Sequence, residues 1–243
     1  MQDRYVGDIG DYAKYSLLRA LSHDRKLGIS WYLFPDEDSG HGGHVGYLLQ
    51  PDKWRDPDPE TFDALRQMMG NFFLEKQERS VEVIEQSDLL PDTRFWSKLT
   101  VGGPGGPGQA QWRRNWFRKS IDCLKDCDIV FADPDNGLRQ REKFEPGQRK
   151  SGKSICEDEA LRLAANSRPV VVYHHNTMFK GGHHAEVEYW QRRLGNGTCA
   201  VRWRLVSPRT FFILNCTKGL RCRAEQWCQK WDLPKQVYLV ASP

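Results

Sequence analysis

The stretch AVRWRLVSPRTFFILN, residues 200–215, decides how the fold ends. Residues 200–206 and 210–215 are rich in β-branched and aromatic residues, which are typical of strands. Only Ser207-Pro208-Arg209 separates the two runs. A connection of three residues joins strands that lie side by side and run in opposite directions. The sequence therefore predicts a C-terminal antiparallel hairpin.

Upstream of this hairpin, short apolar runs alternate with segments of helical spacing. Strands are expected at residues 29–34, 81–84, 128–131 and 170–173, and helices at 11–22, 60–76, 111–124, 157–165 and 186–194. This alternation predicts an α/β fold with a mostly parallel, Rossmann-like sheet. A parallel sheet that closes with a hairpin, its final strand inserted antiparallel, is the outline of class I methyltransferase-like folds. Ligands of such sheets bind beyond the carboxyl ends of the strands.

The composition is that of an ordinary globular protein. Of 243 residues, 39% are apolar and 28% are charged, with a net charge of +4, which excludes a disordered chain. No run approaches the roughly 18 apolar residues of a membrane span, and the charged first residues differ from a signal peptide. We therefore expect a cytoplasmic protein without a membrane partner. The length fits one α/β domain over residues 1–243, with flexible loops near 102–108 and 139–153.

The cysteines predict neither disulfides nor a zinc site. There are seven of them, an odd number, and they are scattered along the chain. Cys123 and Cys127 lie one helical turn apart, but no second pair of Cys or His residues follows nearby. Reduced, mostly buried thiols are the interpretation that fits this pattern.

Polar clusters accompany the first predicted helix and the first predicted strand. Asp11 and Lys14 are spaced so that one helix face presents a carboxylate and an ammonium, although a surface ion pair has the same spacing. The loop at residues 35–44, PDEDSGHGGH, contains three acids, two histidines and three glycines. Carboxylates such as Asp36 and Asp38 can hold a ribose hydroxyl or a divalent metal, and a solvated turn is the alternative.

Two further clusters follow apolar strands. Asp133, Asp135 and Asn136 come directly after residues 128–131, where two carboxylates and an amide suit chemistry or metal binding. Asp-Asn-Gly is also typical of a tight turn. Residues 173–176, YHHN, end the strand at 170–173, and the imidazoles of His174 and His175 are candidate bases, metal ligands or substrate contacts. Whether the four clusters converge depends on the strand order.

Basic and aromatic residues are interleaved in two regions. They are Trp112, Arg113, Arg114, Trp116, Arg118 and Lys119, and then Trp190, Arg192, Arg193, Trp203 and Arg204. Such residues suit phosphates and unstacked bases, which favours a nucleic-acid partner, RNA or DNA. A helix with Trp inside and Arg outside produces the same pattern.

Two of the motifs resemble a known family. Residues 7–15, GDIGDYAKY, are similar to the first helix of the bacterial methyltransferases that modify an adenine N6 of large-subunit ribosomal RNA, whose pattern is G-N-x-x-D-x-x-K-H. Residues 133–136, DPDN, resemble their D-P-P-Y motif. The resemblance implies that Lys14 and Tyr15 contact S-adenosylmethionine (SAM), and that Asp133 and Asn136 clamp a flipped base. Here Tyr15 replaces the family's histidine, and Asp135-Asn136 replace Pro-Tyr.

Three functions follow from these motifs. The first is a SAM-dependent methyltransferase-like enzyme that modifies a base amine. Its catalytic candidates are Asp133, Asp135, Asn136 and His174, and its cofactor-binding candidates are Lys14, Tyr15, Asp8, Asp11, Asp36, Asp38 and His44. The second is a nuclease or phosphodiester hydrolase that uses Mg²⁺ or Mn²⁺. Its candidate ligands are Asp36, Asp38, Asp133 and Asp135, with His44 and His174. The third is a binding module that has lost catalysis.

Overall fold

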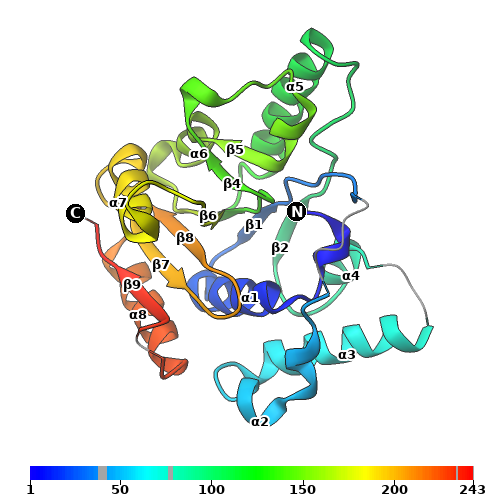
Figure 1. The fold of residues 1–243 in the computed structure, drawn as a ribbon, viewed down its shortest axis with the longest axis vertical. Helices are drawn as coiled ribbons and strands as arrows, with labels where there is room; N and C mark the ends of the chain where they lie inside the picture. Colours follow the sequence, from blue (N-terminus) through cyan, green and yellow to red (C-terminus); the bar gives the residue numbers. More distant parts are fainter. Residues whose placement is uncertain (38–42, 76–78, 234, 243) are drawn as a thin grey trace.

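A seven-stranded mixed sheet forms the centre of the molecule (Figure 1). The computed structural model describes residues 1–37, 43–75, 79–233 and 235–242. The strand order is β2-β1-β3-β6-β8-β7-β9. The first four of these are parallel to one another: β2 (Thr93–Trp96), β1 (Leu27–Ser30), β3 (Ile129–Ala132) and β6 (Val170–His175). The predicted α/β class with a mostly parallel core is confirmed.

The other end of the sheet is antiparallel. It consists of β8 (Arg209–Leu214), β7 (Cys199–Trp203) and β9 (Val237–Val240). The hairpin of β7 and β8 confirms the prediction, and β8 inserts between β6 and β7. Because β8 runs opposite to β6, its first residue, Arg209, pairs with His175 at the carboxyl end of β6. The inserted strand thus begins at the edge where the parallel strands end.

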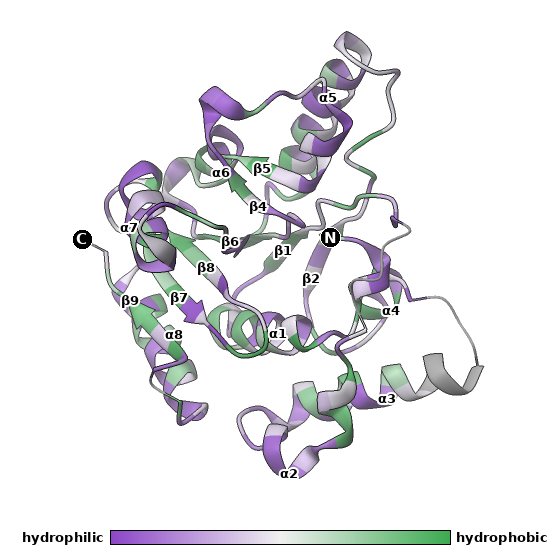
Figure 2. Ribbon diagram, in the orientation of Figure 1, coloured by the Kyte–Doolittle hydropathy of each residue, from purple (hydrophilic) through white to green (hydrophobic). Residues whose placement is uncertain are grey.

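Helices cover both faces of the sheet, and successive strand residues alternate between two apolar cores. One core contains Ile29 and Phe131, and the other contains Val130 and Ala132. The first lies under α1 (Ile9–Ser22), α2 (Pro51–Trp54), α3 (Pro59–Glu75), α4 (Val81–Glu85) and α8 (Lys218–Lys230). The second lies under α5 (Pro107–Cys123), α6 (Glu157–Leu163) and α7 (Gly182–Leu194). Figure 2 shows the hydrophobic strands enclosed by helices that are hydrophilic on the outside.

One local prediction is wrong, and both expected loops contain helical residues. Residues 81–84 form helix α4 and not a strand, because the Ser80 hydroxyl accepts a hydrogen bond from the backbone N–H of Glu82 and caps a helix there. The neighbouring strand is β2, which the sequence did not indicate. Residues 139–153 are not a structureless loop. They connect β4 (Gly137–Arg139) to β5 (Ser154–Cys156), a small parallel sheet, and contain two short 3-10 helices. The glycine-rich stretch at 102–108 ends in the first turn of α5.

Candidate functional site

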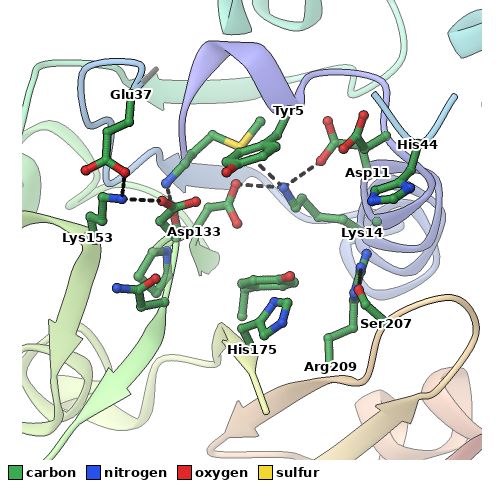
Figure 3. A pocket seen from close by; sticks show the side chains of 17 residues that line it. Tyr5, Asp11, Lys14, Glu37, His44, Asp133, Lys153, His175, Ser207 and Arg209 are labelled. Carbon is green, nitrogen blue, oxygen red and sulfur yellow. Dashed lines mark hydrogen bonds and ion pairs between the residues drawn. The ribbon is translucent and has the colours of Figure 1, made fainter. Parts of the chain in front are cut away.

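A cavity of about 490 Å³ opens at the carboxyl ends of β3 and β6 (Figure 3). Seven of the predicted site residues line it: Asp8, Asp11, Lys14, His44, Asp133, Asp135 and Asn136. They come from the start of α1, the loop after β1 and the turn after β3. The sheet order places β1 beside β3 and α1 across both, which is why these separate segments meet. The clusters therefore converge on one site.

Lys14 forms the floor of the cavity. Its Nζ lies 2.8 Å from Asp11 Oδ1 and 2.7 Å from Asp133 Oδ2. The rings of Tyr15, Trp31 and Tyr173 surround the ammonium at 5.5–5.8 Å from their centroids. The side chain is only 4% exposed. This ion pair therefore joins α1 to β3 inside the protein and is not the surface pair that the spacing also allowed.

The charges of this group depend on one another. Burial alone would lower the pKa of Lys14, but the carboxylates of Asp11 and Asp133 raise it above its ordinary value. Burial raises the pKa of Asp133, and Lys14 counteracts this effect. Removing one member would leave an opposite charge without its partner in a buried place. The group is thus a structural unit as well as part of the cavity wall.

A second ion pair lies on the opposite wall. Lys153 bonds to Glu37 and lies 3.7 Å from Asp135 Oδ2. Asp135 also accepts a hydrogen bond of 2.6 Å from Gln2 Nε2. Figure 3 shows Lys153 and Glu37 together on one side of the cavity. In the turn after β3, Asp133 and Asp135 thus both lie beside a lysine, whereas the Asn136 side chain is exposed.

The loop after β1 packs against the beginning of α1. Ile9 N donates to the carbonyl oxygen of His44, and Gly43 N donates to Asp8 Oδ1 at 3.1 Å. Asp8 also lies 3.1 Å from Arg79. Burial and the nearby Asp11 raise the pKa of Asp8 above its ordinary value. These contacts hold Asp8 and His44 at the cavity.

Three predicted residues lie beside the cavity, and one lies outside the described residues. Tyr15 is fully buried behind the cavity wall, where its hydroxyl donates to Asp11 Oδ2 at 3.3 Å. Asp36 accepts a hydrogen bond from Arg4 N and does not line the cavity. His174 points away from it. Asp38 lies outside the described residues.

His174 joins β6 to α7. Its Nδ1 accepts from Leu138 N at 3.0 Å, and its Nε2 lies 3.1 Å from Glu186 Oε1. Glu186 also accepts hydrogen bonds from Asn176 and Thr177. Burial alone would raise the pKa of Glu186, but the bonds from these three residues lower it to about 2. His174, predicted as a catalytic residue, therefore does not line the cavity, because alternate residues of a strand face opposite sides.

The neighbour of His174, His175, lines the cavity, as His44 does. Although it is exposed at the cavity mouth, its pKa lies below its ordinary value. Partial loss of water from the ring is the main cause of this shift, and the positive charge of Arg209 adds to it. His175 is thus neutral near pH 7 and able to accept a proton.

Other residues of the cavity wall were not among the predicted catalytic and cofactor-binding residues. They are Tyr5, Glu37, Lys153, Tyr173, His175, Ser207 and Arg209. Three of them belong to polar clusters that the sequence indicated. Glu37 lies in the loop after β1, and Tyr173 and His175 flank His174. Ser207 and Arg209 belong to the hairpin connection, where the antiparallel insertion of β8 carries them to this edge. No sequence motif indicated that Lys153 would line the cavity.

Most tryptophans of the basic and aromatic clusters are buried, although Trp112 is 41% exposed. Trp116, Trp190 and Trp203 are buried in the two cores. Arg113 is buried and forms a two-pronged ion pair with Glu159 at 2.7 and 2.9 Å. Trp inside and Arg outside is therefore the interpretation that holds for most of these residues.

The described residues offer no group of three or more His, Cys, Asp and Glu side chains placed to hold a metal ion. The Lys14 ammonium lies between Asp11 and Asp133 and takes the position that a metal ion bound by these two carboxylates would need. The seven cysteines are all free. In the described part of the chain, no helix has the length and apolar character needed to cross a membrane.

No protein-family model matches the chain, and no curated protein matches it significantly.

Proposed function

We propose that the chain is a methyltransferase-like enzyme that transfers a methyl group from SAM to the amino group of a nucleic-acid base. The observation that carries the proposal is the meeting of α1 and the turn at residues 133–136 in one cavity. This cavity lies at the carboxyl edge of a sheet in which β8 inserts antiparallel between β6 and β7. Both the inserted strand and the place of the cavity are typical of class I methyltransferase-like folds.

The β1 side of the cavity suits SAM. A volume of about 490 Å³ falls within the range of small-molecule sites. SAM carries a sulfonium and an ammonium. Asp8 lines the cavity and meets Arg79 through Oδ1, so its other oxygen can accept a hydrogen bond from the ammonium. Lys14 already binds two carboxylates, so in this proposal it holds the floor of the cavity together and does not contact the cofactor's carboxylate. SAM would supply an electrophilic methyl group.

The turn after β3 suits the target amine. The side-chain oxygens of Asp135 and Asn136 can accept hydrogen bonds from an amino group, which orients the nitrogen lone pair towards the methyl group. Tyr5 lines the same cavity and offers an aromatic face in place of the missing tyrosine of the turn. The amine must lose one proton as its new N–C bond forms, and neutral His175 can accept that proton. A base in a duplex would have to leave its stack to enter.

The proposal is tested by methyl transfer. Purified protein is incubated with SAM labelled in its methyl group and with RNA or DNA from cells that lack the protein. We expect label in the bases of one nucleic acid and a loss of about 10²-fold or more in Asn136→Ala and Asp135→Asn. Asp126→Asn, an exposed carboxylate that precedes β3 and so lies at the opposite end of this strand from the turn, is the matched control. Absence of label in both nucleic acids contradicts the proposal.

A metal-dependent phosphodiester hydrolase is the second candidate. Five carboxylates line the cavity, and this observation favours it: Asp8, Asp11, Glu37, Asp133 and Asp135. Their pairing with Lys14, Lys153 and Arg79 disfavours it, because each pair reduces the negative charge that a divalent cation needs. Strand cleavage that requires Mn²⁺ or Mg²⁺ and is lost in Asp133→Asn would replace the first proposal with this one.

A further inference from the structure

Arg209 is held at the cavity between β8 and α1. It begins β8, lines the cavity and is only 7% exposed. Its guanidinium packs on the backbone of Gly10, where an added Cβ would lie 1.8 Å from Nη1. Figure 3 shows Arg209 and Ser207 together, on the side of the cavity away from Lys153 and Glu37. The guanidinium thus occupies space that a side chain at residue 10 would fill.

Arg209 differs in its partners from the other cations of the cavity wall. Lys14 and Lys153 both pair with carboxylates. The guanidinium of Arg209 forms no ion pair with a described residue. Its one side-chain hydrogen bond to a described residue goes to the hydroxyl of Ser207. Its buried Nε has no partner among the described residues. A guanidinium with unpaired N–H groups in a buried place is costly, and a planar anionic group satisfies several of them at once.

The sheet order indicates which anion fits. In the sheet, β1 lies on one side of β3, which is followed by Asp133, and β6 and β8, whose first residue is Arg209, lie on the other. If the cofactor occupies the β1 side and the base meets the turn after β3, the group that reaches Arg209 belongs to the nucleotide that carries the base. We propose that Arg209 and Ser207 bind the phosphate of this nucleotide. This inference rests on the proposed function in naming a nucleotide as the substrate and in placing the cofactor on the β1 side.

The test compares nucleotides with nucleosides. AMP, GMP, CMP and UMP and the four matching nucleosides are titrated calorimetrically into the wild type and into Arg209→Gln and Arg209→Lys. At least one nucleotide should bind the wild type about ten- to a hundredfold more tightly than its nucleoside, because the phosphate adds charge-assisted hydrogen bonds. Arg209→Gln should abolish this preference and Arg209→Lys should retain part of it. The control Arg192→Gln removes an exposed arginine of α7 and should change nothing.

A second variant guards against a failure of Arg209→Gln to fold. Gly10→Ala retains Arg209 but displaces its guanidinium, and alanine suits a helix better than glycine. It should weaken the phosphate preference in a protein whose circular dichroism is unchanged. A preference that persists in Arg209→Gln or in Gly10→Ala overturns the proposal, and so does a wild type that binds nucleotides no better than nucleosides.

Titration of the same variants with SAM separates the two proposals. SAM affinity should be the same in the wild type and in Arg209→Gln. A loss of SAM binding in Arg209→Gln with unchanged nucleotide binding would assign Arg209 to the cofactor's carboxylate and overturn the phosphate site. If the wild type binds no SAM but its phosphate preference depends on Arg209, the proposed methyltransferase fails and the phosphate site stands.

Discussion

Lys14 has a role that its sequence motif did not reveal. The resemblance implied a contact with the cofactor, whereas the structure surrounds the ammonium with Asp11, Asp133 and three aromatic rings. The pair was visible in the sequence only as a spacing of three residues on one helix. Its second carboxylate lies 119 residues away along the chain, and sequence spacing alone cannot place it there.

Replacing Lys14 should therefore destabilise the whole protein. In Lys14→Met, two buried carboxylates lose their cation, and we expect the free energy of unfolding to fall by about 3–5 kcal/mol. Urea denaturation followed by tryptophan fluorescence measures the change. Lys125→Met, at an exposed site, should change stability by less than about 0.5 kcal/mol. A loss below about 1 kcal/mol in Lys14→Met would show that the ion pair does not support the fold.

His175 should determine how the rate of methyl transfer depends on pH. Its pKa lies below its ordinary value of 6.5, and a protonated ring cannot accept the amine's proton. The rate should therefore rise with pH through a midpoint below 6.5 and then level off. His175→Gln should lower the plateau by about 10²-fold and remove this acid limb. An acid limb that is unchanged in His175→Gln assigns the proton acceptor to another group.

At the scale of elements, the sequence predicted types better than boundaries. The helix at 11–22 and the hairpin at 200–215 were predicted correctly because their apolar spacing is unambiguous. Residues 81–84 are too few to distinguish a strand from a helical turn, and the strand β2, TRFW, contains too few apolar residues to stand out. The choice between His174 and His175 depends on where β6 begins and which residues face the cavity. A shift of one residue exchanges the two faces, and the sequence alone does not fix that register.

The connection from β6 to α7 should make stability depend on acid pH. Hydrogen bonds from His174, Thr177 and Asn176 lower the pKa of Glu186 from 4.5 to about 2 despite its burial. A lowered carboxyl pKa stabilises the fold above pH 4.5, by roughly 3 kcal/mol here, and this contribution is lost as the pH falls towards 2. The stability difference between wild type and Glu186→Gln should therefore shrink between pH 4.5 and 2 in urea denaturation. Glu188→Gln, on the same helix, should show no such trend, and a difference that stays constant in Glu186→Gln would refute the role of ionised Glu186.

The hairpin between β7 and β8 contains a strained residue. Val206 has a φ of 64° and is 62% exposed, and Ser207 N donates to Leu205 O across it at 2.8 Å. A β-branched residue at positive φ costs roughly 1–2 kcal/mol, part of which glycine would recover. Val206→Gly should raise the melting temperature by about 2–3 °C in differential scanning calorimetry. Val206→Ala should raise it less, and a lower melting temperature in Val206→Gly would show that the turn is not strained.

At the scale of the whole molecule, the strand order creates the site. The sequence supplied four polar clusters but could not show whether they meet. The order β1-β3-β6-β8 and the reversal at β8 bring α1, the turn after β3 and the hairpin connection to one edge. The strand order also brings residues to the cavity that no local sequence pattern indicates. They are Tyr5, Lys153 and Arg209. The proposed chemistry therefore depends on the cavity as a unit.

Calorimetric titration with SAM, and separately with Mn²⁺, tests the central claim most directly. We predict saturable SAM binding by the wild type, weaker by about tenfold in Asp8→Asn, which keeps the shape of the side chain but removes its charge. Asp52→Asn, an exposed carboxylate of α2, should bind as the wild type does. The affinity for Mn²⁺ should be weak, and Asp133→Asn should leave it unchanged. Absence of SAM binding together with Mn²⁺ binding that is lost in Asp133→Asn would contradict the account and identify the cavity as a metal site.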